Sequence, residues 1–424
     1  MKYLLLAITL FLSSCSRNYL VQENYIQTYQ TGDLICTEQK ITEALEQQNL
    51  SNEKILYLLE RGTVSFASGN VDNAIADYKE AVDLLNGLSE LAPSEELQKI
   101  LLDDNYCFFV GEDYEQVLAR VYLSLALLHK GDYKNATAIL RQAEDIQQRK
   151  IELYRKDRFC SFYQLVENPL AKYLLAILSE KGKDFSNAKI LYSQVSKLLN
   201  QPVEQLKPND HARQTLLFVI HNGNIPNKIS IISEPSIASG LVLETLLSKD
   251  QRTLALSSFT GIPTPLLIQK NSSKSIPLKI SVNGCTENPM TFYALGSIAQ
   301  QQLEKRKPAI AARGLARLAL RRGFVAYAES KDPALGKLFD LAMTIANLSS
   351  EVDTRSWRTL PNTIEVARFD LNECELQATI ESLFTPYPPF KFQVPLKLKS
   401  DLTVINVFII HPGIISIQNP QGLL

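Results

Sequence analysis

The sequence predicts two structural parts: an α-helical part over residues 16–205, and an α+β part with an antiparallel or mixed sheet over residues 212–424. In the first part, apolar residues recur at helical spacing in segments separated by glycine-containing turns. From residue 215 onward, short apolar or alternating runs end at turn residues, as β-strands do. Helical stretches lie between these runs, which favours an α+β arrangement for the second part.

The composition is that of a globular protein. Of the 424 residues, 45% are hydrophobic and 21% are charged, which is enough apolar material for more than one core. The 44 basic residues are balanced by 45 acidic ones. Proteins that bind nucleic acid generally carry a basic surplus, so we expect no nucleic-acid partner.

Residues 1–15, MKYLLLAITLFLSSC, have the organisation of a bacterial export signal. Lys2 supplies a positive charge, and the apolar run that follows it is too short to span a bilayer. Small residues directly before Cys15 resemble the lipobox of bacterial lipoproteins. We therefore expect Cys15 to be acylated and to anchor the mature chain, with an ordinary secretory signal as the alternative. Ser16, in place of an aspartate, favours the outer membrane, with the protein facing the periplasm.

Three segments of the first part repeat a pattern of small and aromatic residues. The small residues let two helices approach closely or turn between them, and the aromatic residues pack against the next pair. The pattern resembles the tetratricopeptide repeat (TPR) and predicts a TPR-like α-helical solenoid. The residues that carry it are Gly62, Gly69, Ala74, Tyr78 and Ala81, then Gly131, Tyr133, Ala136 and Ala143, then Ala188 and Tyr192.

The three segments are unevenly spaced. Ala74, Ala136 and Ala188 are 62 and 52 residues apart, whereas an uninterrupted TPR array repeats every ~34 residues. A non-repetitive helical bundle is the alternative. In either arrangement neighbouring hairpins must stack, and stacking leaves a concave surface of the kind that binds an extended segment of another protein.

The second part contains six predicted strands. They cover residues 215–223, 228–234 and 276–284, then 362–371, 390–398 and 402–410. Two of them end in Asn-Gly, a strong turn signal. Helices are predicted over residues 291–306, from about 308 to 328, and over 334–350.

Arg313, Arg317 and Arg321 recur every four residues and lie on one face of a predicted helix. They form a possible docking strip for anionic lipid headgroups, cell-wall carboxylates or an acidic partner. A solvated helix face is the alternative explanation.

The only tryptophan, Trp357, lies between Arg355 and Arg358 in a polar loop. The three residues form a possible partner anchor or a cation–π stack. Alternatively, Trp357 closes the edge of the sheet as a structural corner.

The sequence contains no recognisable catalytic motif, metal-ligand set or cofactor fingerprint. His221 precedes an Asn-Gly turn and is interpreted as a polar residue at a strand end. Six cysteines are spread along the chain without a CxxC pair, and we expect most to be buried free thiols. We expect no metal and no cofactor.

Four segments resemble, in the same order, blocks of an uncharacterised family of bacterial TPR lipoproteins. They cover residues 111–148, 218–229, 307–321 and 354–371, and the lipobox at Cys15 fits the same family. The resemblance implies an envelope location and assigns no catalytic residue.

Three functions are compatible with these patterns, and the weakest of them is a surface-transport or secretion accessory that docks through Arg313, Arg317 and Arg321. The first is a non-enzymatic, membrane-anchored scaffold or adaptor that binds an envelope protein through its helical groove. The second is an envelope enzyme, with its site in the C-terminal α+β part and the repeats as a recruiting arm.

Overall fold

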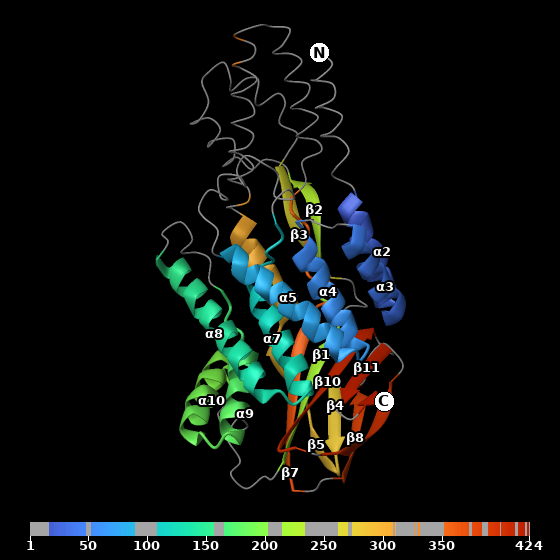
Figure 1. Cartoon of the computed structure of the whole chain (residues 1–424), viewed down its shortest axis with the longest axis vertical. Coiled ribbons are helices and arrows are strands. Elements are labelled where there is room, and N and C mark those ends of the chain that lie inside the picture. The colour runs from blue at the N-terminus through green and yellow to red at the C-terminus, as the bar shows by residue number, and fades with distance from the viewer. Residues whose placement is uncertain are drawn as a thin grey trace.

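The computed structural model describes most of the chain from residue 17 onward (Figure 1). The described residues are 17–47, 52–89, 108–156, 165–201, 214–233, 262–269, 274–307, 310, 327, 330, 352–372, 375–383, 389–398, 400–411, 414–419 and 422–423. Cys15 lies outside them, as do Arg313, Arg317, Arg321 and the predicted helix over 334–350.

The N-terminal part consists of helices that pair in chain order. Short turns join the two helices of each pair, and each helix packs against its partner. The pairs are α2 (Arg17–Gln30) with α3 (Leu34–Gln47), α4 (Lys54–Ala67) with α5 (Val71–Ser89), α7 (Asp113–His129) with α8 (Tyr133–Lys156), and α9 (Pro169–Lys181) with α10 (Phe185–Leu199). The predicted pairing of helices into hairpins is confirmed, whereas a TPR solenoid is not established by these pairs.

The small residues of the repeat pattern lie where the pairs turn or touch. Gly69 and Gly131 occupy the turns with φ of 88° and 78°, a conformation that favours glycine. A Cβ on Gly62 would lie 2.8 Å from the ring of Tyr78 in the partner helix, so only glycine fits there. The five alanines of the pattern and the tyrosine of its third segment are all buried: Ala74, Ala81, Ala136, Ala143, Ala188 and Tyr192.

The C-terminal part contains two larger sheets and a two-stranded ribbon. The six-stranded sheet has the order β12-β11-β10-β1-β7-β6, the four-stranded sheet the order β5-β4-β8-β9, and the ribbon pairs β2 with β3. The strands are β1 (Gln214–Asn222), β2 (Asn227–Ser233), β3 (Ile262–Ile268), β4 (Leu278–Val282), β5 (Cys285–Glu287), β6 (Met290–Tyr293), β7 (Thr363–Leu371), β8 (Glu375–Ser382), β9 (Lys391–Lys397), β10 (Leu402–His411), β11 (Ile414–Asn419) and β12 (Gly422–Leu423).

The six-stranded sheet is mixed, because β1 runs parallel to β10 and antiparallel to β7. Both of its faces are covered. Along β1, Leu217 and Val219 join the core shared with the helices, whereas Leu216, Phe218 and Ile220 join the core shared with the four-stranded sheet. Burial on both faces explains why this strand reads as a continuous apolar run.

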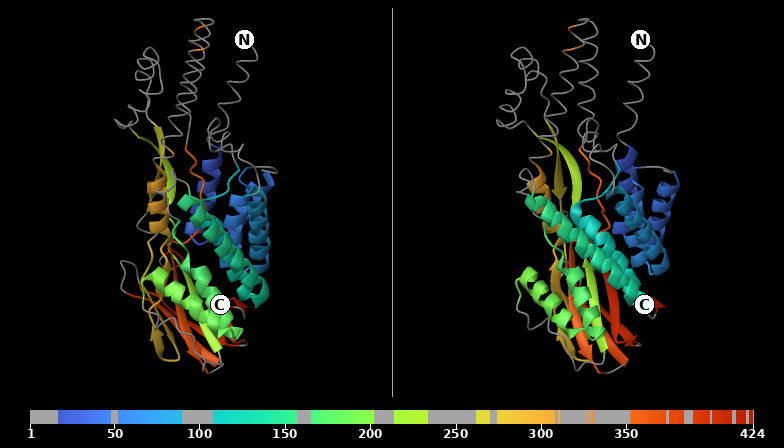
Figure 2. Two further views of the ribbon diagram at one scale, coloured as in Figure 1. Left: turned by 90° about the vertical axis from the view of Figure 1, so that its left-hand side faces the viewer. Right: turned by 60° about the vertical axis from the view of Figure 1, so that its left-hand side comes forward.

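The helices form two layers over this sheet (Figures 1 and 2). The first helix of each pair is the inner one: α2, α4, α7 and α9 all contact strands. The second helices, α3, α5, α8 and α10, form the outer layer. A single hydrophobic core runs from the helices into the six-stranded sheet. The predicted boundary between residues 205 and 212 lies outside the described residues.

The structure corrects two details of the sequence analysis. Residues 290–293 form β6, and the helix predicted from residue 291 begins at residue 295 and is described to 307. The expected burial of free thiols is wrong for the two cysteines described as free: Cys36 is half-buried and Cys285 is exposed beside an Asn-Gly turn.

Candidate functional site

A segment of the C-terminal part, residues 352–361, lies against the inner helices α4 and α7; it is called the extended segment below, although residues 358–359 form a turn. Its backbone N–H groups are bound by two buried carboxylates. The N–H of Trp357 donates to Glu115 Oε1 at 2.8 Å. The N–H groups of Arg358 and Thr359 donate to the two oxygens of Glu60 at 2.7 and 2.9 Å. The helical array thus binds a peptide segment, and that segment belongs to the same chain.

These hydrogen bonds satisfy backbone groups that have left water. A buried N–H without an acceptor costs free energy comparable to a lost hydrogen bond, and a carboxylate is a strong acceptor with two oxygens. Glu60 and Glu115 are themselves fully buried. Burial raises the pKa of Glu60 to about 7 and that of Glu115 to about 8. Hydrogen bonds from the segment lower both pKa values, but the effect of burial is larger.

The Trp357 side chain fills the centre of this interface and is fully buried. Its Nε1–H donates to Thr63 Oγ1 at 3.0 Å, and its ring lies 6.1 Å from Tyr78 and 5.3 Å from Tyr122. The ring packing continues through His221 to the sheet. A partner protein has no access to this tryptophan.

Arg355 and Arg358 also point to partners within the chain. Arg355 makes a two-point ion pair with Asp353, at 2.9 Å from each oxygen, and lies over the ring of Phe109. Arg358 lies 2.7 Å from Glu23 of α2. The interpretation of Arg355, Trp357 and Arg358 as an exposed anchor for another protein is therefore wrong, because all three are buried. The alternative of a corner at the edge of the sheet does not describe Trp357 either, because its side chain contacts Thr63, Tyr78 and Tyr122 of the helices.

His221 is part of the same buried network. Its Nδ1 accepts from the hydroxyl of Tyr122 at 2.9 Å, and its Nε2 lies 3.3 Å from Asn406 Oδ1. The ring stacks on Phe408 with centroids 4.2 Å apart. Burial lowers the pKa of His221 to about 4, so the imidazole is neutral at pH 7. His221 therefore joins helix to sheet as a structural residue.

Two aromatic residues of the repeat pattern, Tyr133 and Tyr192, make hydrogen bonds to strands of the six-stranded sheet. The hydroxyl of Tyr133 donates to the carbonyl of Leu402 on β10 at 2.8 Å. A similar helix-to-sheet contact involves Arg368 of β7. Its guanidinium binds Glu180 of α9 at 2.7 Å and the hydroxyl of Tyr192 of α10 at 2.7 Å.

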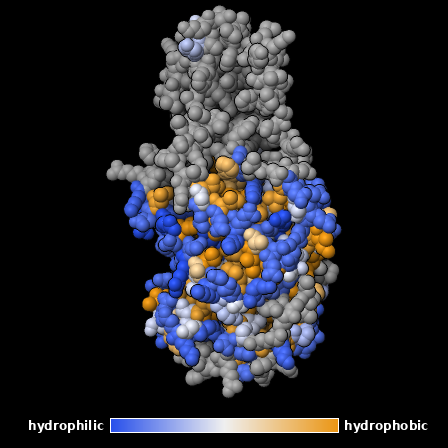
Figure 3. Space-filling model, in the orientation of Figure 1, coloured by the Kyte–Doolittle hydropathy of each residue, from blue (hydrophilic) through white to orange (hydrophobic). Residues whose placement is uncertain are grey.

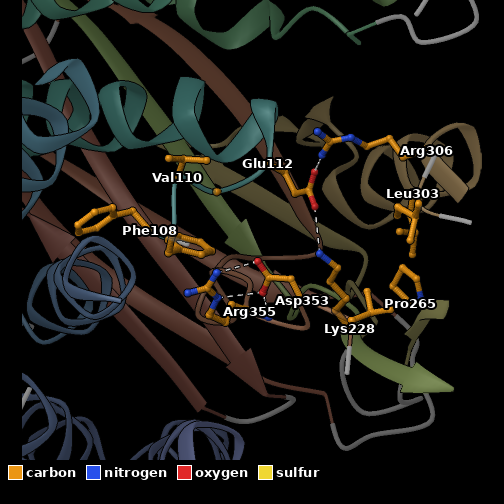
Figure 4. A pocket seen from close by; sticks show the side chains of 13 residues that line it. Phe108, Val110, Glu112, Lys228, Pro265, Leu303, Arg306, Asp353 and Arg355 are labelled. Carbon is orange, nitrogen blue, oxygen red and sulfur yellow. Dashed lines mark hydrogen bonds and ion pairs between the residues drawn. The ribbon is translucent and has the colours of Figure 1, made fainter. Parts of the chain in front are cut away.

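A cavity of about 140 Å³ opens where residues 352–355 enter the helical array. Figure 4 shows five charged side chains around it. Glu112 pairs with Lys228 at 3.1 Å and with Arg306, while Asp353 pairs with Arg355. Four elements supply the walls: the residues before α7, the β2–β3 ribbon, the helix over 295–307, and the extended segment itself.

The residues directly before α7 line this cavity, and hydrogen bonds at the start of the helix fix their positions. Gly111 has φ of 71°, which places the chain for the start of the helix. The N–H of Glu112 donates to Glu115 Oε2 at 2.6 Å, one half of a capping box. Glu115 therefore binds the N-terminus of its own helix with one oxygen and the extended segment with the other.

A smaller pocket of about 20 Å³ adjoins the cavity. Glu112, Lys228 and Leu303 line both spaces, so the two lie next to each other. The inner pocket is also lined by Gln302 and Ser356, both buried.

Comparison of the chain with protein-family models, with curated proteins and with solved structures finds no match. Among the described residues no group of three His, Cys, Asp or Glu side chains is placed to hold a metal ion. Likewise, no helix in the described part is long and apolar enough to cross a bilayer.

Sequence reasoning missed Glu60, Glu115 and the cavity. Glu60 and Glu115 could have been noticed in the sequence, because each is an acidic residue within a helix that is otherwise mostly buried. An acid at such a position needs donors from elsewhere in the fold. The sequence does not show which segment supplies them.

Proposed function

We propose that the chain is a membrane-anchored lipoprotein of the bacterial envelope, and that it acts as a scaffold that binds a protein partner through its helix pairs. Paired helices with TPR-like small-residue spacing support the scaffold role, and the lipobox ending at Cys15 supports the anchor. The described chain begins at Arg17, two residues after Cys15. Two residues span at most ~7 Å, so an acylated Cys15 holds the start of α2 close to the bilayer.

One observation supports the choice of surface for the partner. The inner face of the helix pairs is covered by the sheet and by residues 352–361. The groove predicted for a partner is therefore occupied within the chain. We assign partner binding to the outer layer, where α3, α5, α8 and α10 face solvent.

Each outer helix exposes a large apolar side chain. Ile35 of α3 is 72% exposed, Leu84 of α5 36%, Leu153 of α8 62% and Ile190 of α10 58%. Figure 3 shows apolar side chains among polar ones on the face that carries α5 and α8. Contiguous apolar patches rimmed by polar residues mark protein-binding sites, whereas single exposed apolar residues are ordinary, so the assignment requires one partner that covers several of these side chains together.

Site-specific photo-crosslinking in the native envelope tests this assignment. A photoreactive residue at Leu153 or Ile190 of the full chain is expected to form a discrete adduct with one protein. The matched control is the same residue at Gln393, an exposed position on β9. Equal adduct patterns from all three positions, or adducts only from Gln393, would contradict an outer-layer binding surface.

Acylation is tested separately in the producing bacterium. Labelled palmitate is expected to enter the full chain and to be absent from the Cys15→Ala variant, which should also leave the membrane fraction. Equal membrane association of the two proteins would contradict the anchor. The envelope-enzyme alternative stays a prediction, since no observed feature of the C-terminal part favours it over the scaffold.

A further inference from the structure

The cavity and its inner pocket hold two hydrogen-bond donors with few partners. Ser356 is 5% exposed, and its hydroxyl makes no hydrogen bond to any described residue. The Lys228 ammonium carries three donors, and Glu112 is the acceptor that the described residues offer it. Both side chains line the inner pocket. A buried hydroxyl without a partner is unusual, and here it leaves a donor that a bound group can use.

Part of the wall of the outer space is apolar, and the rest is formed by charged side chains. Phe109, Val110, Pro265 and Leu303 form the apolar part, and Figure 4 shows Leu303 and Pro265 together on the side opposite Phe108 and Val110. Its volume is close to that of an engineered cavity of ~150 Å³ that holds benzene. A ring or a short alkyl chain therefore fits between these walls.

The charges around the cavity favour an anion. Lys228, Arg306 and Arg355 face two carboxylates, Glu112 and Asp353, which leaves one positive charge in excess. Glu115 lies behind the wall and is hydrogen-bonded to the N–H groups of Glu112 and Trp357. Because burial raises the pKa of Glu115 to about 8, its carboxyl is mostly neutral at pH 7.

We propose that this cavity binds a small carboxylate that carries an apolar group. The carboxylate enters the inner pocket and accepts hydrogen bonds from Lys228 and Ser356. The apolar group fills the outer space between Phe109, Val110, Pro265 and Leu303. Such a ligand joins the β2–β3 ribbon, the start of α7 and the extended segment. The proposal does not depend on the scaffold function.

Isothermal titration calorimetry of the full chain tests the proposal with butyrate, hexanoate and benzoate, each paired with its neutral amide. At least one carboxylate is expected to bind saturably at one site per chain, and its amide about tenfold more weakly or not at all. Saturable binding of none of the three acids, or equal binding of acid and amide, would overturn the proposal.

Two variants locate the site. Ser356→Ala removes only the hydroxyl, so the fold is expected to persist while the affinity for the carboxylate falls about threefold to tenfold. Lys228→Gln removes the charge and is expected to lower the affinity more. The matched control is Lys279→Gln, which removes a lysine paired with Glu381 on the four-stranded sheet and is expected to change nothing. Should Lys228→Gln fail to fold, Ser356→Ala still decides, because an unchanged affinity in that variant would contradict the proposed pose.

Discussion

The carboxylate of Glu60 on α4 accepts the backbone N–H of Arg358 at 2.7 Å, although the two residues are 298 positions apart in the sequence. The second oxygen of Glu60 accepts the next N–H along, that of Thr359. One side chain of the helical array therefore fixes the backbone of the segment that leads into β7. This contact makes the helices and the sheet one unit and closes the groove in which a partner was expected.

Replacing Glu60 by glutamine should destabilise the protein. The amide keeps one acceptor but turns an N–H₂ donor toward a backbone donor, which leaves a buried N–H unsatisfied. We expect a loss of about 1–3 kcal/mol in the free energy of unfolding, measured in urea. Glu46→Gln is the control, because Glu46 is exposed on α3. Equal stabilities of the two variants would mean that Glu60 does not hold the segment.

The close approach of α4 and α5 can be tested at glycine. In Gly62→Ala the new methyl group would lie 2.8 Å from the Tyr78 ring, so we expect a loss of about 1–3 kcal/mol from overpacking. Gly87→Ala, in α5, meets no atom within 4 Å and should stabilise the protein by about 0.5–1 kcal/mol through helix propensity. Thermal unfolding of both variants measures the difference. A neutral Gly62→Ala would contradict the observed packing.

Stability should fall as the pH rises from about 6.5 to 8. Glu60 and Glu115 have pKa values of about 7 and 8 in the native state, so both still bind protons at the start of this range. The same two residues have already lost their protons in the unfolded chain, so raising the pH favours unfolding. Below pH 6.5 two histidines oppose this trend, the half-buried His129 and the buried His221. His129 and His221 have pKa values lowered to about 4, so the unfolded chain binds more protons there and stability rises with pH.

Urea unfolding at several pH values measures this dependence. We expect a loss of about 2 kcal/mol between pH 6.5 and 8 in the unaltered chain, and a much smaller loss in Glu60→Gln/Glu115→Gln. The comparison is between the slopes of the unfolding free energy against pH, so the lower overall stability of the double variant does not affect it. Identical slopes would show that these two carboxyls do not titrate in that range.

Removing Arg368 should release the last helix pair from the sheet. Its guanidinium binds Glu180 and Tyr192, and Glu180 is itself buried, so Arg368→Ala leaves an uncompensated charge. We expect a loss of about 3–5 kcal/mol. Hydrogen exchange should accelerate in α9 and α10 more than in α4 and α5. Lys189→Ala, an exposed position on α10, is the control, and a uniform acceleration across all helices would argue against a local clamp.

Much of the secondary structure could be predicted because its causes are local. Gly69 and Gly131 mark turns that need positive φ, and the apolar run of β1 reflects burial on both faces. Strand β3 was missed because Pro263 and Pro265 argue against a strand in sequence terms. In the structure it is one of only two strands in the ribbon, where an edge accommodates proline.

The site could not be predicted because its partners are distant in sequence. A tryptophan between two arginines has the composition of an exposed anchor, and only the fold shows that Glu60, Glu115 and Thr63 surround it. The cavity likewise combines Glu112, Lys228 and Asp353 from three separate regions. Local patterns carry no information about such combinations.

The central claim is that residues 352–361 occupy the helical groove of their own chain, with Trp357 at the centre. Since Trp357 is the only tryptophan, its fluorescence reports on this site alone. In the native full chain we expect blue-shifted emission that iodide barely quenches, and both properties should be lost together on unfolding in urea. Native emission quenched by iodide as strongly as that of free tryptophan would contradict the account.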